Sequence, residues 1–478
     1  MSRSHSDMEV QALIAAAVAP LLARIAQQDQ RIAELQKRVV ELEAENARLK
    51  KNSSNSSKPP SSDITKPPAP KSPKGGAKIG GQPGHPKHER LDLPPEQVDQ
   101  IQTYRRTSCP DCGGPVQGAA QAPRKFQQLE LAARPLIVTE HRAEWVWCPH
   151  CRRRHATELP EELTRAGLLG PKLTALTGWF KSRGHDSYSI LAEFMADVCG
   201  LQVSRGLLAK ALQKVSAALA APYAALCEAL PSQERLNVDE TGHPENKQRM
   251  WTWAFRAERF TVFHIDPSRG SEVLIALLGA QFRGVLGCDY FSAYRKYMGA
   301  GAVTVQFCLA HLIRDLKFLT SLPDRLTQKW AGQMLAGMRR LFGVIHRRGR
   351  QSAAAFDRAL VRARDTLLAR GRRGPRRTEV QNIVRRFQEH GAAYFQFVTT
   401  PGIEPTNNLA EQALRCVVID RKLTQGTRSL RGREWSQRIW TVAATCIQQN
   451  RSLFKYLCTA LAASFAGRPA PSLLPIAV

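Results

Sequence analysis

Three short apolar runs near the middle of the chain constrain its fold more than any other feature. Residues 236–242 read LNVDETG, residues 250–255 read MWTWAF and residues 260–265 read FTVFHI. The runs are rich in β-branched and aromatic residues, and turn residues or charges separate them, so they predict an antiparallel three-strand meander. Asp239 is expected near the end of the first strand, where its carboxylate can serve as a metal ligand. Glu240 would face the opposite side of the sheet.

Helix and strand patterns alternate after the meander. The predicted order is a helix at 268–280, a strand at 284–289 that ends in Asp289, a strand at 304–308 and a helix at 309–319. This is the order of a ribonuclease-H-like domain, in which the ends of the first and fourth strands lie side by side. Two facing carboxylates are costly unless cations lie between them, so Asp239 and Asp289 predict two Mg²⁺ or Mn²⁺ ions. For either aspartate alone, the alternative is a strand-end turn residue.

A third ligand is expected from a later helix, which begins within residues 404–415 (EPTNNLAEQALR). Glu411 lies at the rim of the apolar face of that helix, from where it can reach the sheet edge. The alternative is structural, because Asn408 and Glu411 have the spacing of a capping box and Arg415 follows Glu411 by one turn. The local pattern leaves both roles open.

Charge and cysteine content restrict the partners and the compartment. The chain has 69 Lys and Arg residues against 41 Asp and Glu, a net charge of +28, which indicates a nucleic-acid partner. The sequence has no run of eighteen apolar residues, so it predicts no membrane span. Eleven cysteines, four of them in two C-x-x-C pairs, favour a metal site in a reducing, cytoplasmic compartment over a disulfide framework.

The N-terminal region carries a heptad pattern over residues 11–50. Positions 18, 25, 32, 39 and 46 are Val, Ile, Ile, Val and Asn, and Leu occupies most positions three residues further on. This pattern predicts a parallel two-stranded coiled coil, and therefore a homodimer, with a helix packed on its own domain as the alternative. Residues 51–95, rich in Pro, Gly, Ser and Lys, predict a linker.

The two C-x-x-C pairs are Cys109 with Cys112 and Cys148 with Cys151. Four thiolates in this arrangement predict a structural Zn²⁺ ribbon, with a redox dithiol as the competing interpretation. Strand-like pieces lie between and beside them at residues 126–131, 136–139 and 144–147. Residues 161–232 are helical in pattern and include a candidate DNA-reading helix at 205–214 after a Gly turn, although any two packed helices give the same pattern.

Several long motifs point to a known family. They are NSSNSSKPPSSD at 52–63, GGQPGH at 80–85, the paired C-x-x-C, VDET at 238–241, GCD at 287–289 and NNLAE at 407–411. Over nearly its full length the chain resembles the bacterial insertion-sequence transposases of family sixty-six, within the DDE superfamily. The resemblance implies that Asp239, Asp289 and Glu411 form a triad that binds two Mg²⁺ ions. It also places His311, in the motif Cys308-Leu-Ala-His311, in a supporting role near the site.

The function expected from this resemblance is DNA transposition in the bacterial cytoplasm, in association with the nucleoid. The protein would bind terminal inverted repeats, hydrolyse a strand to free a 3′-hydroxyl and transfer that end to target DNA, with or without companion proteins of the same element. Arg421, Lys422 and Arg428 are the expected contacts to the DNA backbone. The rival interpretations are a nuclease of the same fold without strand transfer and a non-enzymatic zinc-ribbon DNA-binding regulator.

The resulting organisation is multidomain, with an α/β ribonuclease-H-like core, a helical insertion, and a coiled coil, zinc ribbon and helical DNA-binding region before it. The predicted boundaries are 1–50 for the coiled coil, 51–95 for the linker, 96–160 for the ribbon, 161–232 for the helical region, 233–320 and 401–465 for the core, 321–400 for the insertion and 466–478 for the tail.

Overall fold

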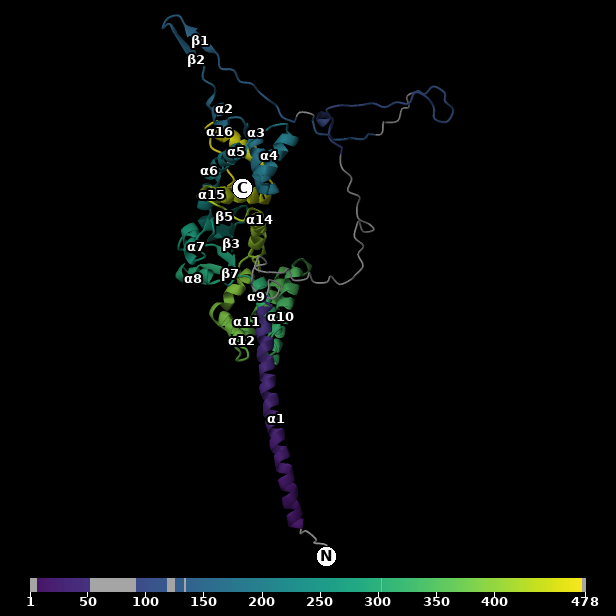
Figure 1. The fold of residues 1–478 in the computed structure, drawn as a ribbon, viewed down its shortest axis with the longest axis vertical. Helices are drawn as coiled ribbons and strands as arrows, with labels where there is room; N and C mark the ends of the chain where they lie inside the picture. The colour runs from purple at the N-terminus through teal and green to yellow at the C-terminus, as the bar shows by residue number, and fades with distance from the viewer. Residues whose placement is uncertain (1–6, 52–91, 118–124, 133–134, 302, 475–478) are drawn as a thin grey trace. The chain divides into compact units, whose positions relative to one another are not determined.

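The structure, a computed structural model, describes residues 7–51, 92–117, 125–132, 135–301 and 303–474 (Figure 1). The chain divides into two compact units. The larger unit comprises residues 1–67, 142–193 and 203–478, and the smaller unit comprises residues 68–141 and 194–202. Most of the predicted linker, including its GGQPGH motif, lies outside the described residues.

A five-stranded mixed sheet forms the centre of the larger unit. Its strands are β3 (Arg235–Glu245), β4 (Gln248–Arg256), β5 (Thr261–Asp266), β6 (Val285–Cys288) and β7 (Thr304–Phe307). Their order is β5-β4-β3-β6-β7, with antiparallel pairing from β5 to β3 and parallel pairing from β3 to β7. The predicted meander and the two later strands are therefore confirmed. Aromatic side chains such as Trp253, Phe255 and Phe263 are fully buried around this sheet.

The first strand is longer than the sequence predicted. It continues past Asp239 to Glu245, and the hairpin turn falls at Asn246 and Lys247, whose φ angles are 45° and 67°. Two consecutive residues with positive φ form the tight turn that matches the twist of a hairpin. The expectation of a strand end at Asp239 was wrong, because residues 242–245 pair with β4 instead of turning. Asp239 lies in the middle of β3.

Helix α15 (Leu430–Gln448) protects the edge of the sheet at β5. Alternate backbone amides of this strand donate to side chains one helical turn apart on α15. These bonds run from Thr261 to Thr445 (3.2 Å), from Phe263 to Thr441 (2.9 Å) and from Ile265 to Gln437 (2.6 Å). A covered edge cannot pair with a strand of another chain, so the helix closes the sheet on this side.

Helices account for most of the rest of the larger unit, as the sequence predicted. Between and after the strands are α7 (Ser271–Leu278), α8 (Ser292–Gly301), α9 (Leu309–Thr320), α14 (Asn408–Thr424) and α16 (Leu453–Phe465). The predicted insertion contains α10 (Arg325–His346), α11 (Ala353–Gly371), α12 (Thr378–His390) and α13 (Gln396–Thr399). Before the sheet are α2 (Glu161–Ala166), α3 (Pro171–Trp179), α4 (Tyr188–Asp197), α5 (Arg205–Ala218) and α6 (Ala220–Glu228). Ser204 caps α5 by accepting a hydrogen bond from the Leu207 amide.

The N-terminal heptad region forms one helix, α1 (Asp7–Leu49). Its apolar heptad side chains are exposed in the single chain, with exposed fractions from 39% at Val18 to 79% at Leu49. Only the end of α1 is tied to the body, where Arg48 forms an ion pair with Glu379 at 2.6 Å. The helix is confirmed, and the dimer stays a prediction.

In the ribbon region, β1 (Trp145–Cys148) and β2 (Arg153–Ala156) form an antiparallel hairpin. This agrees with the predicted strand at 144–147, whereas residues 126–131 and 136–139 form no strand. Among the described residues, no helix is long and apolar enough to cross a membrane.

Candidate functional site

Asp239 and Asp289 are brought together by the parallel pairing of β3 with β6. The register places Arg235 opposite Val285 and Asn237 opposite Gly287. Two residues further on, Asp239 lies within β3 and Asp289 directly follows the end of β6, and continuation of the register places both on the same face of the sheet. Gly287 leaves room for the Asn237 side chain, because a Cβ there would lie 2.6 Å from the Asn237 side-chain nitrogen.

The electrostatics of this pair are unfavourable. Burial raises the pKa of Asp239 well above its ordinary value, and the charges of Glu240, Asp289 and Glu411 raise it further. Burial and the charge of Glu240 raise the pKa of Asp289 to about 7, although a hydrogen bond from the Phe291 amide opposes this shift. Carboxyl groups in such surroundings resist ionisation unless a cation compensates their charge.

Glu240 has its charge compensated within the protein. Its side chain is 1% exposed and accepts hydrogen bonds from Arg269, whose Nη2 lies 2.7 Å from Oε1, and from the Tyr294 hydroxyl at 2.5 Å. The Arg269 guanidinium is in turn 3.9 Å from the centre of the Phe291 ring. Glu240 is therefore engaged in an ion pair with a partly exposed arginine, and the choice of Asp239 over Glu240 as a metal ligand stays a prediction.

Glu411 lies in the first turn of α14. Its contacts differ from both structural alternatives, the capping box with Asn408 and the ion pair with Arg415. Its Oε2 accepts a hydrogen bond from Arg314 of α9 at 3.2 Å, and its Oε1 is 3.6 Å from His311 Nδ1. The predicted capping box is wrong, because the residue that precedes the helix is Asn407 and its side chain does not cap α14. The tertiary contact with α9 orients Glu411.

Asn407 instead joins three elements around the acids. Its Nδ2 donates to the Val238 carbonyl of β3 at 2.8 Å, and its Oδ1 accepts from Asn237 at 3.0 Å. Its backbone amide donates to the Cys308 thiol at 3.1 Å. Asn407 is 1% exposed, so these bonds are shielded from water. The sequence analysis missed this role, and only the repeated Asn at 407 and 408 hinted at it.

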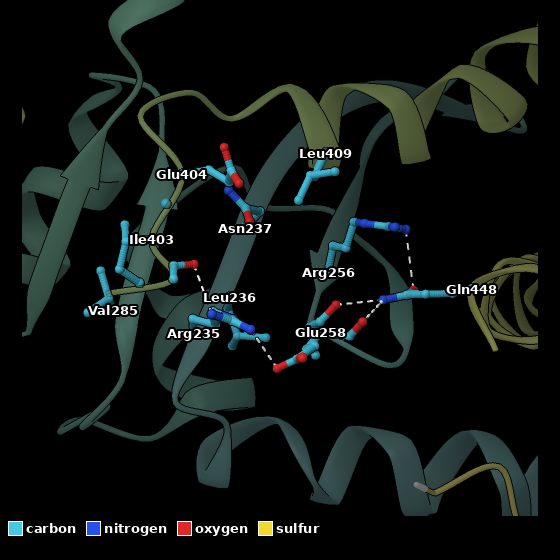
Figure 2. Close-up of a pocket in the computed structure, with 13 residues that line it drawn as sticks. Arg235, Leu236, Asn237, Arg256, Glu258, Val285, Ile403, Glu404, Leu409 and Gln448 are labelled. Carbon is cyan, nitrogen blue, oxygen red and sulfur yellow. Dashed lines mark hydrogen bonds and ion pairs between the residues drawn. The ribbon is translucent and has the colours of Figure 1, made fainter. Parts of the chain in front are cut away.

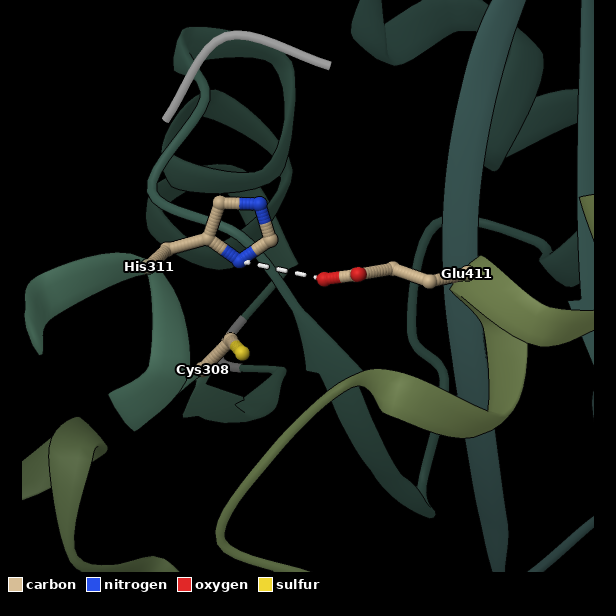
Figure 3. A group of neighbouring side chains, drawn as sticks. All are labelled: Cys308, His311 and Glu411. Carbon is tan, nitrogen blue, oxygen red and sulfur yellow. Dashed lines mark ion pairs between the residues drawn. The ribbon is translucent and has the colours of Figure 1, made fainter. Parts of the chain in front are cut away.

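Cys308, His311 and Glu411 form a compact group (Figure 3). One potential ligand atom from each lies within 4.8 Å of the other two, and no other such group of three occurs among the described residues. The charge of Glu411 raises the pKa of Asp239, but neither aspartate joins Glu411 in a cluster this tight. His311 lies beside the third acid, as the resemblance implied.

A pocket of about 350 Å³ opens beside the start of β3 (Figure 2). Its lining includes Asn237 and Leu409, but none of the three acids. Its two arginines already have partners: Arg235 forms an ion pair with Glu258, and Arg256 donates to Gln448 Oε1 at 3.3 Å. The lining therefore combines apolar side chains with polar groups that are paired within the protein.

The three predicted DNA contacts differ in their surroundings. Lys422 and Arg428 are exposed. Arg421 is half-buried and donates through Nη1 to the Gly242 carbonyl and to Thr241 of β3. Burial lowers the pKa of Arg421. This arginine therefore fastens the end of α14 to the sheet.

A second buried polar network, which the sequence analysis missed, lies further along β3. His243 Nε2 is 3.0 Å from the Thr427 hydroxyl, which donates to Glu245 at 2.8 Å. Burial lowers the pKa of His243 to about 4, and the charges of Arg421 and Arg433 contribute to this shift. No sequence pattern links residues so far apart.

The predicted zinc ligands form two separate turns, one in each unit. Hydrogen bonds from the Asp111 and Cys112 amides lower the pKa of the Cys109 thiol. Hydrogen bonds from Cys151 and from the His150 amide likewise lower the pKa of the Cys148 thiol. Amides that favour a thiolate suit metal ligands, and the assembly of all four into one site stays a prediction.

A mixed sheet with two half-buried aspartates, one in β3 and one at the end of the neighbouring β6, and a third acid from a later helix defines an α/β protein with an acidic site. Residues 166–434 match the Transposase IS66 family, which is more than half of the chain, and the chain belongs to this family. The resemblance seen in the sequence is thereby confirmed, and membership implies a DNA-acting enzyme. Residues 2–91 match a family of unknown function, DUF6444. No curated protein matches the chain.

Proposed function

We propose that this transposase cuts and joins DNA through a DDE triad of Asp239, Asp289 and Glu411. The observation that supports the proposal is the β3–β6 register, which, continued by two residues, puts Asp239 beside Asp289 at the end of β6. The strand order β5-β4-β3-β6-β7, with three antiparallel and two parallel strands, supports a ribonuclease-H-like core. A non-enzymatic regulator would have no use for a buried acidic cluster that costs stability.

The donor set fits two Mg²⁺ or Mn²⁺ ions, because hard cations prefer carboxylate oxygens. The raised pKa values of Asp239 and Asp289 mean that their ionised forms are disfavoured in the protein alone, and a bound cation would favour ionisation. When bound, two such ions activate the attacking water or 3′-hydroxyl and stabilise the charge that develops on the leaving oxygen.

The protein's own residues hold the acids in place. Asn407 connects the β3 backbone beside Asp239 to the start of the helix that carries Glu411. Arg314 holds the Glu411 carboxylate and must release it before Glu411 turns toward the aspartates. His311 Nδ1 lies 3.6 Å from the same carboxylate, so the supporting role proposed for His311 is to position Glu411.

Basic side chains beyond the acids are suited to bind the terminal repeats and the target DNA. Lys422 and Arg428 are the proposed contacts to backbone phosphates on and after α14. In the helical insertion, Arg339, Arg340 and Arg347 line an open hollow on α10. Phosphate contacts of this kind give affinity that falls with salt and carries no sequence information.

The N-terminal regions would assemble the complex. A parallel coiled coil of two α1 helices buries the exposed heptad side chains and pairs two DNA ends in one dimer. The four cysteines would hold one structural Zn²⁺ in a ribbon next to the basic run at residues 152–154. Companion proteins of the same element stay a prediction.

The test is a nicking and joining assay on duplexes that carry the DNA flanking the reading frame, with Mg²⁺ or Mn²⁺. Asp239→Asn and Asp289→Asn should each lower nicking by at least about a hundredfold, because they remove a ligand of the reaction centre. Asp357→Asn, at an exposed aspartate of α11, is the matched control. Full nicking by Asp239→Ala would refute the triad, and nicks without joined products would indicate a nuclease.

A further inference from the structure

We propose that Cys308, His311 and Glu411 form a second metal site, which binds a thiophilic divalent cation such as Zn²⁺. The site differs from the proposed Mg²⁺ centre in its ligands, since it offers a thiol, an imidazole and one carboxylate. Zinc accepts all three donor types, whereas Mg²⁺ requires oxygen. Three protein ligands leave a fourth position for water.

The geometry of the start of α9 favours such a site. Cys308 immediately precedes the helix and His311 lies in its first turn, so one rigid element presents both side chains. Glu411 completes the group from α14, with all three ligand atoms within 4.8 Å of one another. Figure 3 shows the His311 ring and the Glu411 carboxylate facing each other across the group. Shifts of about 1 Å would bring these atoms to the separation that a tetrahedral ion requires.

Two further observations indicate a ligand. His311 Nδ1 is buried and has no hydrogen-bond partner among the described residues, although Glu411 Oε1 is 3.6 Å away. A buried nitrogen without a partner is costly, and a metal ion would satisfy it. The Asn407 amide donates to the Cys308 sulfur, and such outer bonds typically orient a metal ligand.

Arg314 is the competitor of the metal. Its guanidinium lies 3.2 Å from Glu411 Oε2 and 3.4 Å from His311 Nε2, so it supplies the positive charge that a cation would otherwise provide. Two cations cannot both pair with one carboxylate at this distance without repulsion. Zinc binding therefore displaces Arg314, and the Cys308 thiol releases its proton to solvent when the Zn–S bond forms.

Occupancy has a functional consequence that rests on the proposed triad. Glu411 cannot serve the Zn²⁺ and the catalytic centre at once, so Zn²⁺ should inhibit Mg²⁺-driven nicking by withdrawing the third acid. Because Cys308 is not a ligand of the oxygen-only centre, its removal should abolish this inhibition.

The first experiment counts the Zn²⁺ bound to the full-length protein after equilibration with Zn²⁺ and desalting. Cys308→Ser should bind one Zn²⁺ ion fewer per chain than the wild type. Zn²⁺ bound by the four cysteines of the predicted ribbon does not affect this difference, because both proteins contain them. Cys446→Ser is the matched control, because it also replaces a buried thiol by a hydroxyl and should lose none. Equal zinc content in the wild type and Cys308→Ser would overturn the site.

A second variant keeps the proposal testable if Cys308→Ser does not fold. Arg314→Gln removes the competitor, so titration with Co²⁺, read from the charge-transfer band of the cobalt–thiolate bond, should show affinity about tenfold or more above wild type. Unchanged Co²⁺ affinity would contradict the proposal. Both measurements omit DNA, so a protein that binds zinc as expected but never nicks would refute the proposed function alone.

Discussion

Replacement of Asn407 by Ala tests whether one side chain holds the acidic site together. The paired register of β3 with β6 ends at Asn237, and the next carbonyl along β3, that of Val238, accepts its hydrogen bond from Asn407. Loss of this donor leaves a buried carbonyl without that partner, which costs about 1–3 kcal/mol. Loss of the bond from Asn237, which is partly exposed and can turn to water, costs about 1 kcal/mol more.

The expected loss of unfolding free energy is therefore about 2–4 kcal/mol. Urea unfolding followed by tryptophan fluorescence measures it, because Trp253 is fully buried in the same sheet. Asn408→Ala is the matched control, since Asn408 is the exposed neighbour on the same helix and its loss should cost less than about 0.5 kcal/mol.

The same variant should also lose nicking activity under conditions where it remains folded, because the start of α14 is no longer fixed to β3. If Asn407→Ala were as stable as Asn408→Ala, the hydrogen bonds around Asn407 would not have the strength that their burial implies, and the account of the site would be refuted.

Three further perturbations test other parts of the structure. The pKa of His243 is about 4 in the fold against about 6.5 in the unfolded chain. The unfolding free energy should therefore be about 3 kcal/mol higher above pH 6.5 than near pH 4. His243→Gln should flatten this pH dependence, which urea unfolding at several pH values measures. Arg269→Gln leaves the buried Glu240 without its cation and should lower the unfolding free energy by about 3 kcal/mol. Ile32→Asp should convert a dimer to a monomer in sedimentation, whereas Gln30→Asp, on the outer side of the heptad, should not.

Each of these has a result that would contradict it. A pH dependence unchanged by His243→Gln would show that the pKa of His243 is not lowered in the fold. A cost for Arg269→Gln no larger than that for Arg283→Gln, at an exposed arginine, would show that Glu240 finds another partner. A monomeric wild-type protein would favour the alternative in which α1 serves its own chain.

Local patterns in the sequence determined the secondary structure and the family. The heptad repeat predicted one long helix, and the apolar runs predicted the meander and the two later strands, because side-chain periodicity follows directly from backbone geometry. The order of strands was enough to bring Asp239 and Asp289 together, since parallel pairing in register leaves little choice of face. The length of β3 was mispredicted, because pairing with β4 extended a strand through residues that commonly form turns.

Only the tertiary structure decided the surroundings of the third acid. The sequence offered Glu411 a capping role or an ion pair with Arg415, both of which involve near neighbours. Its actual partner, Arg314, lies 97 residues away, and the bond from Asn407 to Val238 spans 169 residues. Contacts at such separations depend on how α9 and α14 pack against the sheet, which no local pattern encodes. The sequence therefore predicted the three acids, and packing determined that Arg314 contacts Glu411 and that the Asn407 side-chain amide ties the start of its helix to β3.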